Sequence, residues 1–460
     1  MSIAFASTVV PMAVGLLLAS AAAATPAFEP AAAPDPKVSR REAAEIVRSL
    51  ADLMAASYVD SVLGAEVQRK LLGRLKAGAY ARLDRPRPLV AELVSDVQAV
   101  IADGHFNILY FPPQAPGFSW VNSGEGPRDE QAMLEEARGR LRGGNFGVAK
   151  AEVLEGNVGW LTISKFDAPL PLFREPLAAA FELLRNTDAL VVDLRKNPGG
   201  NPECVALAIS YFLDGPAVLA TSTYHRSRKE RTDYWTSPDP GGPKYLGRPV
   251  YVLTSSATAS GGEMFSYQMK HRRVGTLVGE GTMGGAHSFD TYKIGAPRVG
   301  NVMVLLPDAR TIDGATNGDW EKVGVPPDVE APADEAPKVA LRHALETLLA
   351  KAESAELRAS YQNQLDKLAF AATHGAPATA DLEKYVGRYG IRRVFLADGR
   401  LKYQRDNGPP VDLEPVAEDT FELNVAMTPK PRVRFELEGN EAKAMVLRQP
   451  GGEERIERER

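Results

Sequence analysis

The sequence predicts a mixed α/β protein, in which an α/β core lies between an N-terminal helical domain and a small C-terminal antiparallel β domain. Three observations support this prediction. Apolar residues recur at helical spacing from 39 to 101, strand-like and helix-like segments alternate from about 147, and a period of two appears beyond 381. A chain of 460 residues has room for about two to four domains.

The composition excludes several broad classes of protein. With 44% apolar and 25% charged residues, the chain is neither wholly disordered, nor collagen-like, nor a coiled-coil rod. The 54 basic and 59 acidic residues give a net charge of −5, so we expect no nucleic-acid partner, because phosphate binding needs a basic face. The single cysteine, Cys204, has no partner for a disulfide and is expected to be a small buried residue.

The N-terminus is expected to be a secretory signal peptide over 1–24, followed by an Ala- and Pro-rich linker over 25–38. Residues 3–24 carry no charge and end in small residues that suit cleavage after Ala24. Because no Lys or Arg precedes this run, an uncleaved membrane anchor is the alternative, although Pro11 interrupts it. We therefore expect an exported, periplasmic or extracellular protein that has no stable membrane insertion after cleavage.

The other domain boundaries follow changes in the residue pattern. Apolar spacing predicts three helices in a domain over 39–103, the last of them starting near Arg87-Pro88. The α/β core is expected over 104–335, a helical connector over 336–376, and the small β domain over 377–460.

Strands and helices alternate in the predicted core, which is typical of α/β proteins. Continuous apolar runs predict buried strands, and helical spacing or a Pro in the first turn predicts helices. The expected strands cover 158–163, 189–194 and 249–253, and the expected helices cover 170–184, a segment starting at 201–203, and 261–271.

Ser260 lies at the junction between a predicted buried strand and a predicted helix, in Thr258-Ala259-Ser260-Gly261-Gly262-Glu263. A hydroxyl at this junction is exposed, and the free N–H groups at the start of the helix lie where they can stabilise an oxyanion. Taken alone, a Ser-Gly pair before a helix is more often a simple cap.

The segment Asp193-Leu194-Arg195-Lys196-Asn197-Pro198-Gly199-Gly200 carries a buried strand into a tight Pro-Gly-Gly turn. Such a turn exposes N–H groups that can supply a second donor to an oxyanion, although an ordinary strand-to-helix turn has the same pattern. His105 lies in another Gly-containing turn, Asp103-Gly104-His105-Phe106. The six histidines form no His-x-x-x-His pair, so the sequence predicts no metal site and no cofactor.

Four ordered motifs together resemble the tail-specific (C-terminal processing) serine peptidases, over about residues 100–335. They are Asp193–Gly200, Thr258–Glu263, Gly279–His287 and Trp320–Asp328. The resemblance implies a crotonase/Clp-protease-like spiral of strands and helices. The Ser–Lys dyad of one branch of that family is absent, because the position 25 residues after Ser260 is Gly285.

The other branch, which is similar to the tricorn protease and to bacterial relatives of the interphotoreceptor retinoid-binding protein, uses His, Ser and Glu. The resemblance then implies that His105 is the general base, Ser260 the nucleophile and Glu321 the residue that orients the imidazole. Gly261 and one of Gly199 and Gly200 would donate N–H groups to the oxyanion. A serine that precedes the histidine in the tricorn pattern is Gly104 here.

The leading interpretation is a serine peptidase that hydrolyses peptide bonds in a polypeptide substrate through an acyl-enzyme. Two alternatives remain: a non-catalytic protein on the same fold that binds apolar ligands or peptides, and an esterase with the same triad. The sequence is compatible with an oligomer and does not identify the substrate.

Overall fold

The structure is a computed structural model that describes residues 35–112, 129–295, 298–373, 379–427, 430–449 and 451–459. The expected signal peptide (1–24) and most of the expected linker (25–38) lie outside these residues. Within the described segments, no helix has the length and apolar character needed to cross a membrane. The chain divides into two compact units, residues 1–153 with 159–337 and residues 154–158 with 338–460.

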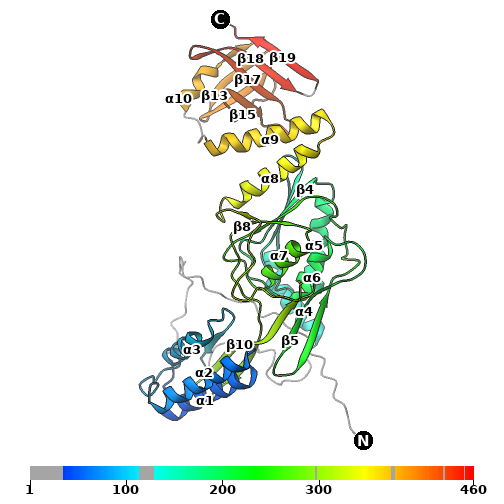
Figure 1. Cartoon of the computed structure of the whole chain (residues 1–460). Coiled ribbons are helices and arrows are strands. Elements are labelled where there is room, and N and C mark those ends of the chain that lie inside the picture. Colours follow the sequence, from blue (N-terminus) through cyan, green and yellow to red (C-terminus); the bar gives the residue numbers. More distant parts are fainter. Residues whose placement is uncertain are drawn as a thin grey trace. The chain divides into compact units, whose positions relative to one another are not determined.

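The first unit begins with the three helices that the sequence predicts (Figure 1). Ser39 begins the first of them through a capping box with Glu42, and Asp60 caps the second. Their apolar faces share one buried core with strands β1, β9 and β10. The helices are α1 (Arg40–Ser57), α2 (Ser61–Lys76) and α3 (Pro86–Ile101).

The first unit also contains a five-stranded sheet. Its strands are in the order β1-β10-β5-β6, and β9 pairs with β10. Each strand pair in it is antiparallel. A long strand, β10, therefore joins the N-terminal helices to the rest of the unit. The strands are β1 (Asn107–Phe111), β5 (Leu219–His225), β6 (Glu230–Trp235), β9 (Ser288–Ile294) and β10 (Asn301–Asp313).

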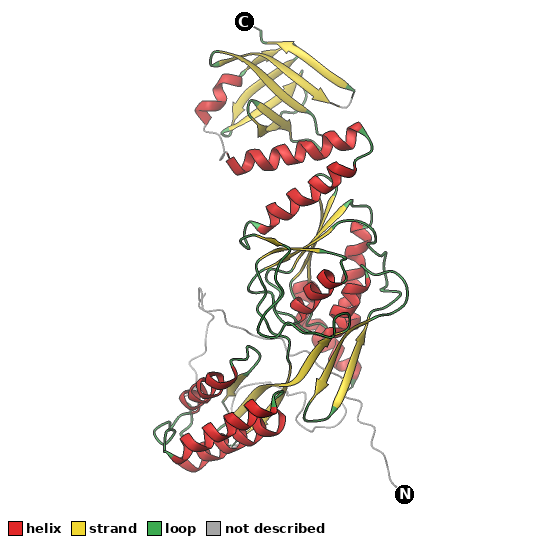
Figure 2. Ribbon diagram, in the orientation of Figure 1, coloured by secondary structure: helices red, strands yellow, loops and turns green. Residues whose placement is uncertain are grey.

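A six-stranded sheet in the order β11-β8-β7-β4-β3-β2 forms the α/β core, and β4, β7, β8 and β11 run parallel. Helices α5, α6 and α7 pack with it around one apolar core (Figure 2). The predicted alternation of strands and helices is therefore confirmed. The strands are β2 (Val148–Leu154), β3 (Val158–Ile163), β4 (Ala189–Asp193), β7 (Val250–Thr254), β8 (Thr276–Gly279) and β11 (Val329–Glu330).

The predicted core helices over 170–184 and 261–271 have the expected bounds, and a third begins at the expected position, whereas the helical segments over 130–147 were not predicted. Asn201 caps α6 with Pro202 in the first turn, as expected from the Asn-Pro-Glu pattern. The helices are α4 (Glu130–Leu141), the 3-10 helix η1 (Arg142–Gly147), α5 (Leu170–Leu184), α6 (Pro202–Ser210) and α7 (Gly261–His271).

The second unit is an eight-stranded antiparallel sheet whose strands pair in chain order, preceded by helices. Tyr389, Val433 and Met445 are fully buried in its core. The predicted C-terminal β domain is thus confirmed. Its elements are α8 (Ala336–Lys351), α9 (Ala355–Thr373), α10 (Thr379–Leu382), η2 (Glu383–Tyr385), β12 (Gly387–Tyr389), β13 (Arg392–Ala397), β14 (Arg400–Arg405), β15 (Val411–Ala417), β16 (Thr420–Leu423), β17 (Arg432–Glu438), β18 (Glu441–Gln449) and β19 (Gly452–Glu457).

This second unit includes the tip of the β2–β3 hairpin, residues 154–158, although the two strands belong to the core sheet. Glu155 in that tip accepts hydrogen bonds from Lys367, at 2.8 Å, and from Lys430. The two ammonium groups lower the pKa of the Glu155 carboxyl against the effect of its burial. The tip is therefore held by charged groups that lie more than 200 residues further along the chain.

Candidate active site

Ser260 connects β7 to α7 and has a backbone conformation that non-glycine residues rarely adopt, with φ 49° and ψ −116°. A positive φ at a serine costs free energy and persists only where the surrounding structure holds it. The backbone N–H of Ser260 donates to the Glu263 carboxylate at 2.8 Å. This strained strand-to-helix turn is the arrangement that presents a nucleophilic hydroxyl in hydrolases.

The glycine loop after β4 lies directly against Ser260. A Cβ atom on Gly199, which has φ +102°, would lie 2.7 Å from the Ser260 Cβ and 2.6 Å from the Gly261 N atom. A Cβ atom on Gly261 would lie 3.0 Å from the Gly200 N atom. The structure therefore brings Ser260, Gly199, Gly200 and Gly261 together, and the first glycine is needed because no side chain fits there.

Asn197 holds this loop in place and distinguishes the two glycines. Its side chain accepts the Gly199 N–H at 2.8 Å and donates to the Ile163 carbonyl at 2.8 Å. Within the described residues, the N–H groups of Gly200 and Gly261 donate no hydrogen bond. The geometry thus favours Gly200 over Gly199 as the partner of Gly261 in an oxyanion hole.

Glu263 is fully buried and connects Ser260 to the glycine-rich turn over 282–285. Besides the Ser260 N–H, its two oxygens accept the Gly285 N–H at 2.8 Å, and the Gly284 N–H and the Thr282 hydroxyl at 2.6 Å each. Burial raises the pKa of this carboxyl, and the hydrogen bonds oppose that effect. Glu263 therefore fixes the Ser260 backbone relative to the turn.

His105 lies in the turn between α3 and β1 and is 2% exposed. Its ring stacks on Phe289, and its Nδ1 atom has no hydrogen-bond partner among the described residues. A Cβ atom on Gly285 would lie 2.6 Å from the His105 Cε1 atom, so the same turn that Glu263 holds packs against the imidazole. Burial lowers the pKa of His105, which keeps the ring neutral.

Glu321 contacts the same glycine-rich turn from its other side. Its carboxylate accepts the Ala286 N–H at 2.8 Å and the His287 N–H at 3.1 Å. Burial raises the pKa of Glu321, against the lowering effect of His287. In the part of the chain that the structure describes, no hydrogen bond joins Glu321 to the ring of His105, so these two predicted residues are linked indirectly, in one way through the turn.

The imidazole nearest to Glu321 is that of His287. Its Nδ1 atom lies 2.8 Å from Asp103 Oδ2 and 3.6 Å from Glu321 Oε1. Burial by itself would lower the pKa of His287, but the hydrogen bond with Asp103 and the charge of Glu321 outweigh it and raise the pKa. Asp103 also accepts the His105 backbone N–H at 3.0 Å and the Tyr58 hydroxyl at 3.1 Å.

Two groups of side chains in the described residues offer metal-ligating atoms within 4.8 Å of one another: Asp103, His287 and Glu321, and also His225, Asp290 and Asp308. In the first group the His287 ring is already bound to Asp103. In the second, the Arg228 guanidinium pairs with Asp290. The absence of a metal and a cofactor thus stays a prediction.

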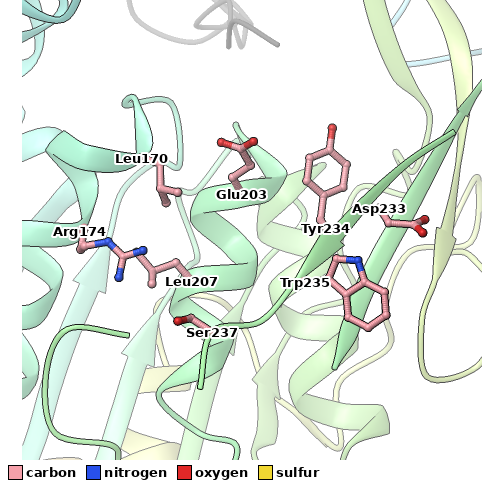
Figure 3. A pocket seen from close by; sticks show the side chains of 8 residues that line it. All are labelled: Leu170, Arg174, Glu203, Leu207, Asp233, Tyr234, Trp235 and Ser237. Atoms are coloured by element: carbon pink, nitrogen blue, oxygen red, sulfur yellow. The ribbon is translucent and has the colours of Figure 1, made fainter. Parts of the chain in front are cut away.

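Two cavities lie near these elements. One of about 510 Å³ is lined by His287 and Glu321 together with Tyr58, Val59, Asp60, Ser61, Leu63, Arg310, Asp319 and Lys322. Figure 3 shows another, of about 230 Å³, in which Glu203 and Leu207 of α6 face side chains of α5 and β6. Glu203 and Leu207 lie on the face of α6 opposite Val205, the residue that approaches Gly261.

Sequence reasoning did not assign roles to Asp103, Asn197, Glu263 or His287, although each one holds a predicted site residue. Asn197, Glu263 and His287 stand inside motifs that the sequence analysis names, and Asp103 stands two residues before His105. A buried polar residue inside a Gly-rich motif was therefore the available signal.

Comparison with known proteins gives matches within the α/β core. Residues 157–331 match the family model for Peptidase family S41. A tail-specific protease of Haemophilus influenzae is 35% identical over 101 residues, which are 22% of this chain and 14% of that protein. A carboxyl-terminal-processing protease of Synechocystis sp. is 29% identical over 129 residues, 28% of each chain.

The aligned segments thus span less than a third of either curated relative. Among solved structures, the photosystem II D1 C-terminal processing protease is similar with a TM-score of 0.41 and 16% identity, over 64% of this chain and 94% of that one.

Proposed function

We propose that this chain, whose residues 157–331 match the family model for Peptidase family S41, is a serine peptidase that hydrolyses polypeptides through an acyl-enzyme on Ser260. The observation that carries the proposal is the Ser260 turn, where a strained serine lies beside the N–H groups of Gly200 and Gly261. The names of the curated relatives, which are proteases, support a polypeptide substrate.

In the proposed acylation step, the Ser260 oxygen attacks the scissile carbonyl carbon while His105 takes the hydroxyl proton. The N–H groups of Gly200 and Gly261 stabilise the oxyanion that forms. His105 then gives its proton to the leaving amine, and the acyl group stays on Ser260. Water, activated by the same imidazole, releases the acyl group as a carboxylic acid and restores the serine.

The neutral, buried state of His105 supports its role as the base. A base must be unprotonated to take the proton of Ser260, and the lowered pKa of His105 keeps it so at neutral pH. We propose that Glu321 supports this base, as in the His-Ser-Glu branch, by holding the turn over 285–287 against it.

A fluorophosphonate probe tests the proposal, because it reacts only with an activated serine. We expect the full chain to be labelled at Ser260, and we expect labelling to be lost in His105→Ala. If the folded protein is not labelled, the proposal of an acyl-enzyme fails and the alternative of a binding protein is favoured. Labelling that is followed by hydrolysis of esters but not of any peptide in a peptide library would favour an esterase.

The pH dependence of activity provides a second test. Because burial lowers the pKa of His105, kcat/KM is expected to rise with pH at a midpoint below the ordinary imidazole value of about 6.5. The measurement is kcat/KM from pH 4 to 9 on one chromogenic substrate, with circular dichroism at each pH to show that the protein stays folded. A midpoint above 7 would contradict the assignment of His105 as base.

We also propose that the protein is exported and that residues 1–24 are removed, which rests on the uncharged apolar run over 3–24. Expression of the full chain in a Gram-negative host, followed by mass spectrometry of the periplasmic fraction, is expected to give a mature N-terminus at Thr25. A cytoplasmic product that retains Met1 would contradict it.

A further inference from the structure

His287 is a half-buried ionisable group of the site that the proposed mechanism does not use. Its side chain is 15% exposed and lies between two carboxylates, Asp103 at 0% and Glu321 at 12% side-chain exposure. Two carboxylates this close to each other repel unless a cation or a hydrogen-bond donor lies between them. The ring of His287 supplies that donor, through Nδ1.

The carboxylates of Asp103 and Glu321 are both linked to His105, in each case through backbone N–H groups. Asp103 is two residues before His105 and accepts its backbone N–H at 3.0 Å, which fixes the turn that carries the ring. Glu321 accepts the N–H groups of Ala286 and His287, next to Gly285, whose Cα lies against the ring. His287 is the residue that touches both carboxylates.

We propose that His287 is a positioning residue of the site: by joining Asp103 to Glu321 it couples Glu321 to His105, to whose ring Glu321 makes no hydrogen bond in the described structure. This inference rests on the proposed serine peptidase function. It assigns Asp103 as the nearest anion to the imidazolium that His105 becomes when it takes the Ser260 proton. That charge is costly in a fully buried place unless an anion is held nearby.

The charge on His287 then changes the environment of His105. A protonated His287 offsets the charge of Asp103 and disfavours a second positive charge on His105, whereas a neutral His287 leaves the charge of Asp103 to stabilise it. The titratable and charged groups that face His287 are Asp103, Glu321, Asp319, His105 and Tyr58, with Asp60, Arg310 and Lys322 lining the adjoining cavity.

Two substitutions separate positioning from simple packing. His287→Asn keeps an N–H donor close to the place of Nδ1 but cannot take a proton, whereas His287→Ala removes the donor altogether. His225→Ala is the matched control, because His225 also lies beside a buried carboxylate, with its Nδ1 3.3 Å from Asp308, on another part of the unit.

The first readout is the rate constant of fluorophosphonate labelling at Ser260, measured from pH 5 to 9. We expect His287→Ala to lower it by a factor of about 100, as a small displacement of a catalytic group does, and His287→Asn to recover to within about tenfold of wild type with an altered pH profile. The control should keep the wild-type rate. A folded His287→Ala protein with the wild-type rate and pH profile would overturn the proposal.

Loss of labelling in His287→Ala as complete as in Ser260→Ala, with labelling retained in His105→Ala, would also overturn it, since His287 would then be the base itself.

The second readout does not depend on activity. In protein labelled with ¹³C-histidine, the C2–H signals of His105 and His287 are followed against pH and assigned with the single variants. We expect the titration midpoint of His105 to rise by about 0.5–1 pH unit in His287→Ala, because a neighbouring positive charge is removed. If wild type is not labelled but this shift appears, the peptidase proposal fails while the coupling stands. If the midpoint does not move, the coupling fails.

Discussion

Alanine at position 260 is expected to lower the turnover of peptide or ester substrate by a factor on the order of 10⁶, the effect of removing a triad nucleophile. The substitution removes only the Oγ atom, and the hydrogen bond from the backbone N–H of residue 260 to Glu263 does not depend on the side chain. The stability of the protein should therefore change little. The measurement is kcat on a chromogenic ester, together with thermal unfolding of both proteins.

Ser256→Ala is the control for this experiment, since Ser256 is an exposed serine that follows the same strand, β7. It should keep both labelling and turnover. Turnover of the Ser260→Ala protein within tenfold of wild type would move the nucleophile to another residue.

Glutamine at position 263 should destabilise the protein and inactivate it together. Each oxygen of Glu263 accepts two hydrogen bonds: one oxygen accepts the N–H groups of Ser260 and Gly285, and the other accepts the Gly284 N–H and the Thr282 hydroxyl. A glutamine must place its NH₂ group against one of these pairs. Leaving two buried donors without an acceptor is expected to lower the free energy of unfolding by roughly 2–5 kcal/mol.

Urea unfolding of the full chain measures this loss, and the fluorophosphonate rate of the folded variant measures the effect on Ser260. Glu203→Gln makes the same change at a half-exposed carboxylate in the first turn of α6, and its stability should change by less than about 0.5 kcal/mol. Equal stability of Glu263→Gln and wild type would show that the turn over 282–285 is held by other contacts.

Much of the core could be predicted because its signals are local. The helices over 170–184 and 261–271 agree residue for residue with α5 and α7, since apolar spacing, Pro near the first turn and the Gly pair after Ser260 define their ends. Strands β5, β6, β9 and β10 were not predicted. Their segments mix polar and apolar residues, and their pairing joins positions far apart in the chain, as in Asn107 with Leu305 and Thr221 with Asp313.

The same difference between local signals and long-range contacts explains which parts of the candidate site could be predicted from the sequence. Ser260 and the glycines of its two turns lie in short motifs, so the sequence identifies them as candidates. That Glu321 reaches His105 through residues 285–287, and that His287 stands between Asp103 and Glu321, depends on contacts across 184 and 34 positions of the chain. Neither the periodicity nor the motifs of a single sequence indicate contacts between residues this far apart in the chain.

The hairpin tip over 154–158 limits where the chain can be divided into independent parts. A C-terminal module that was merely appended would be removable by ending the chain at residue 337. Here Glu155 would then be left without Lys367 and Lys430, and the loop between two core strands would lose its anchors. The second unit is therefore not one continuous segment of the chain, because residues 154–158 belong to it. If an added protease cuts the chain near residue 337, we expect the two fragments to copurify. We expect neither fragment alone to reproduce the properties of the full chain.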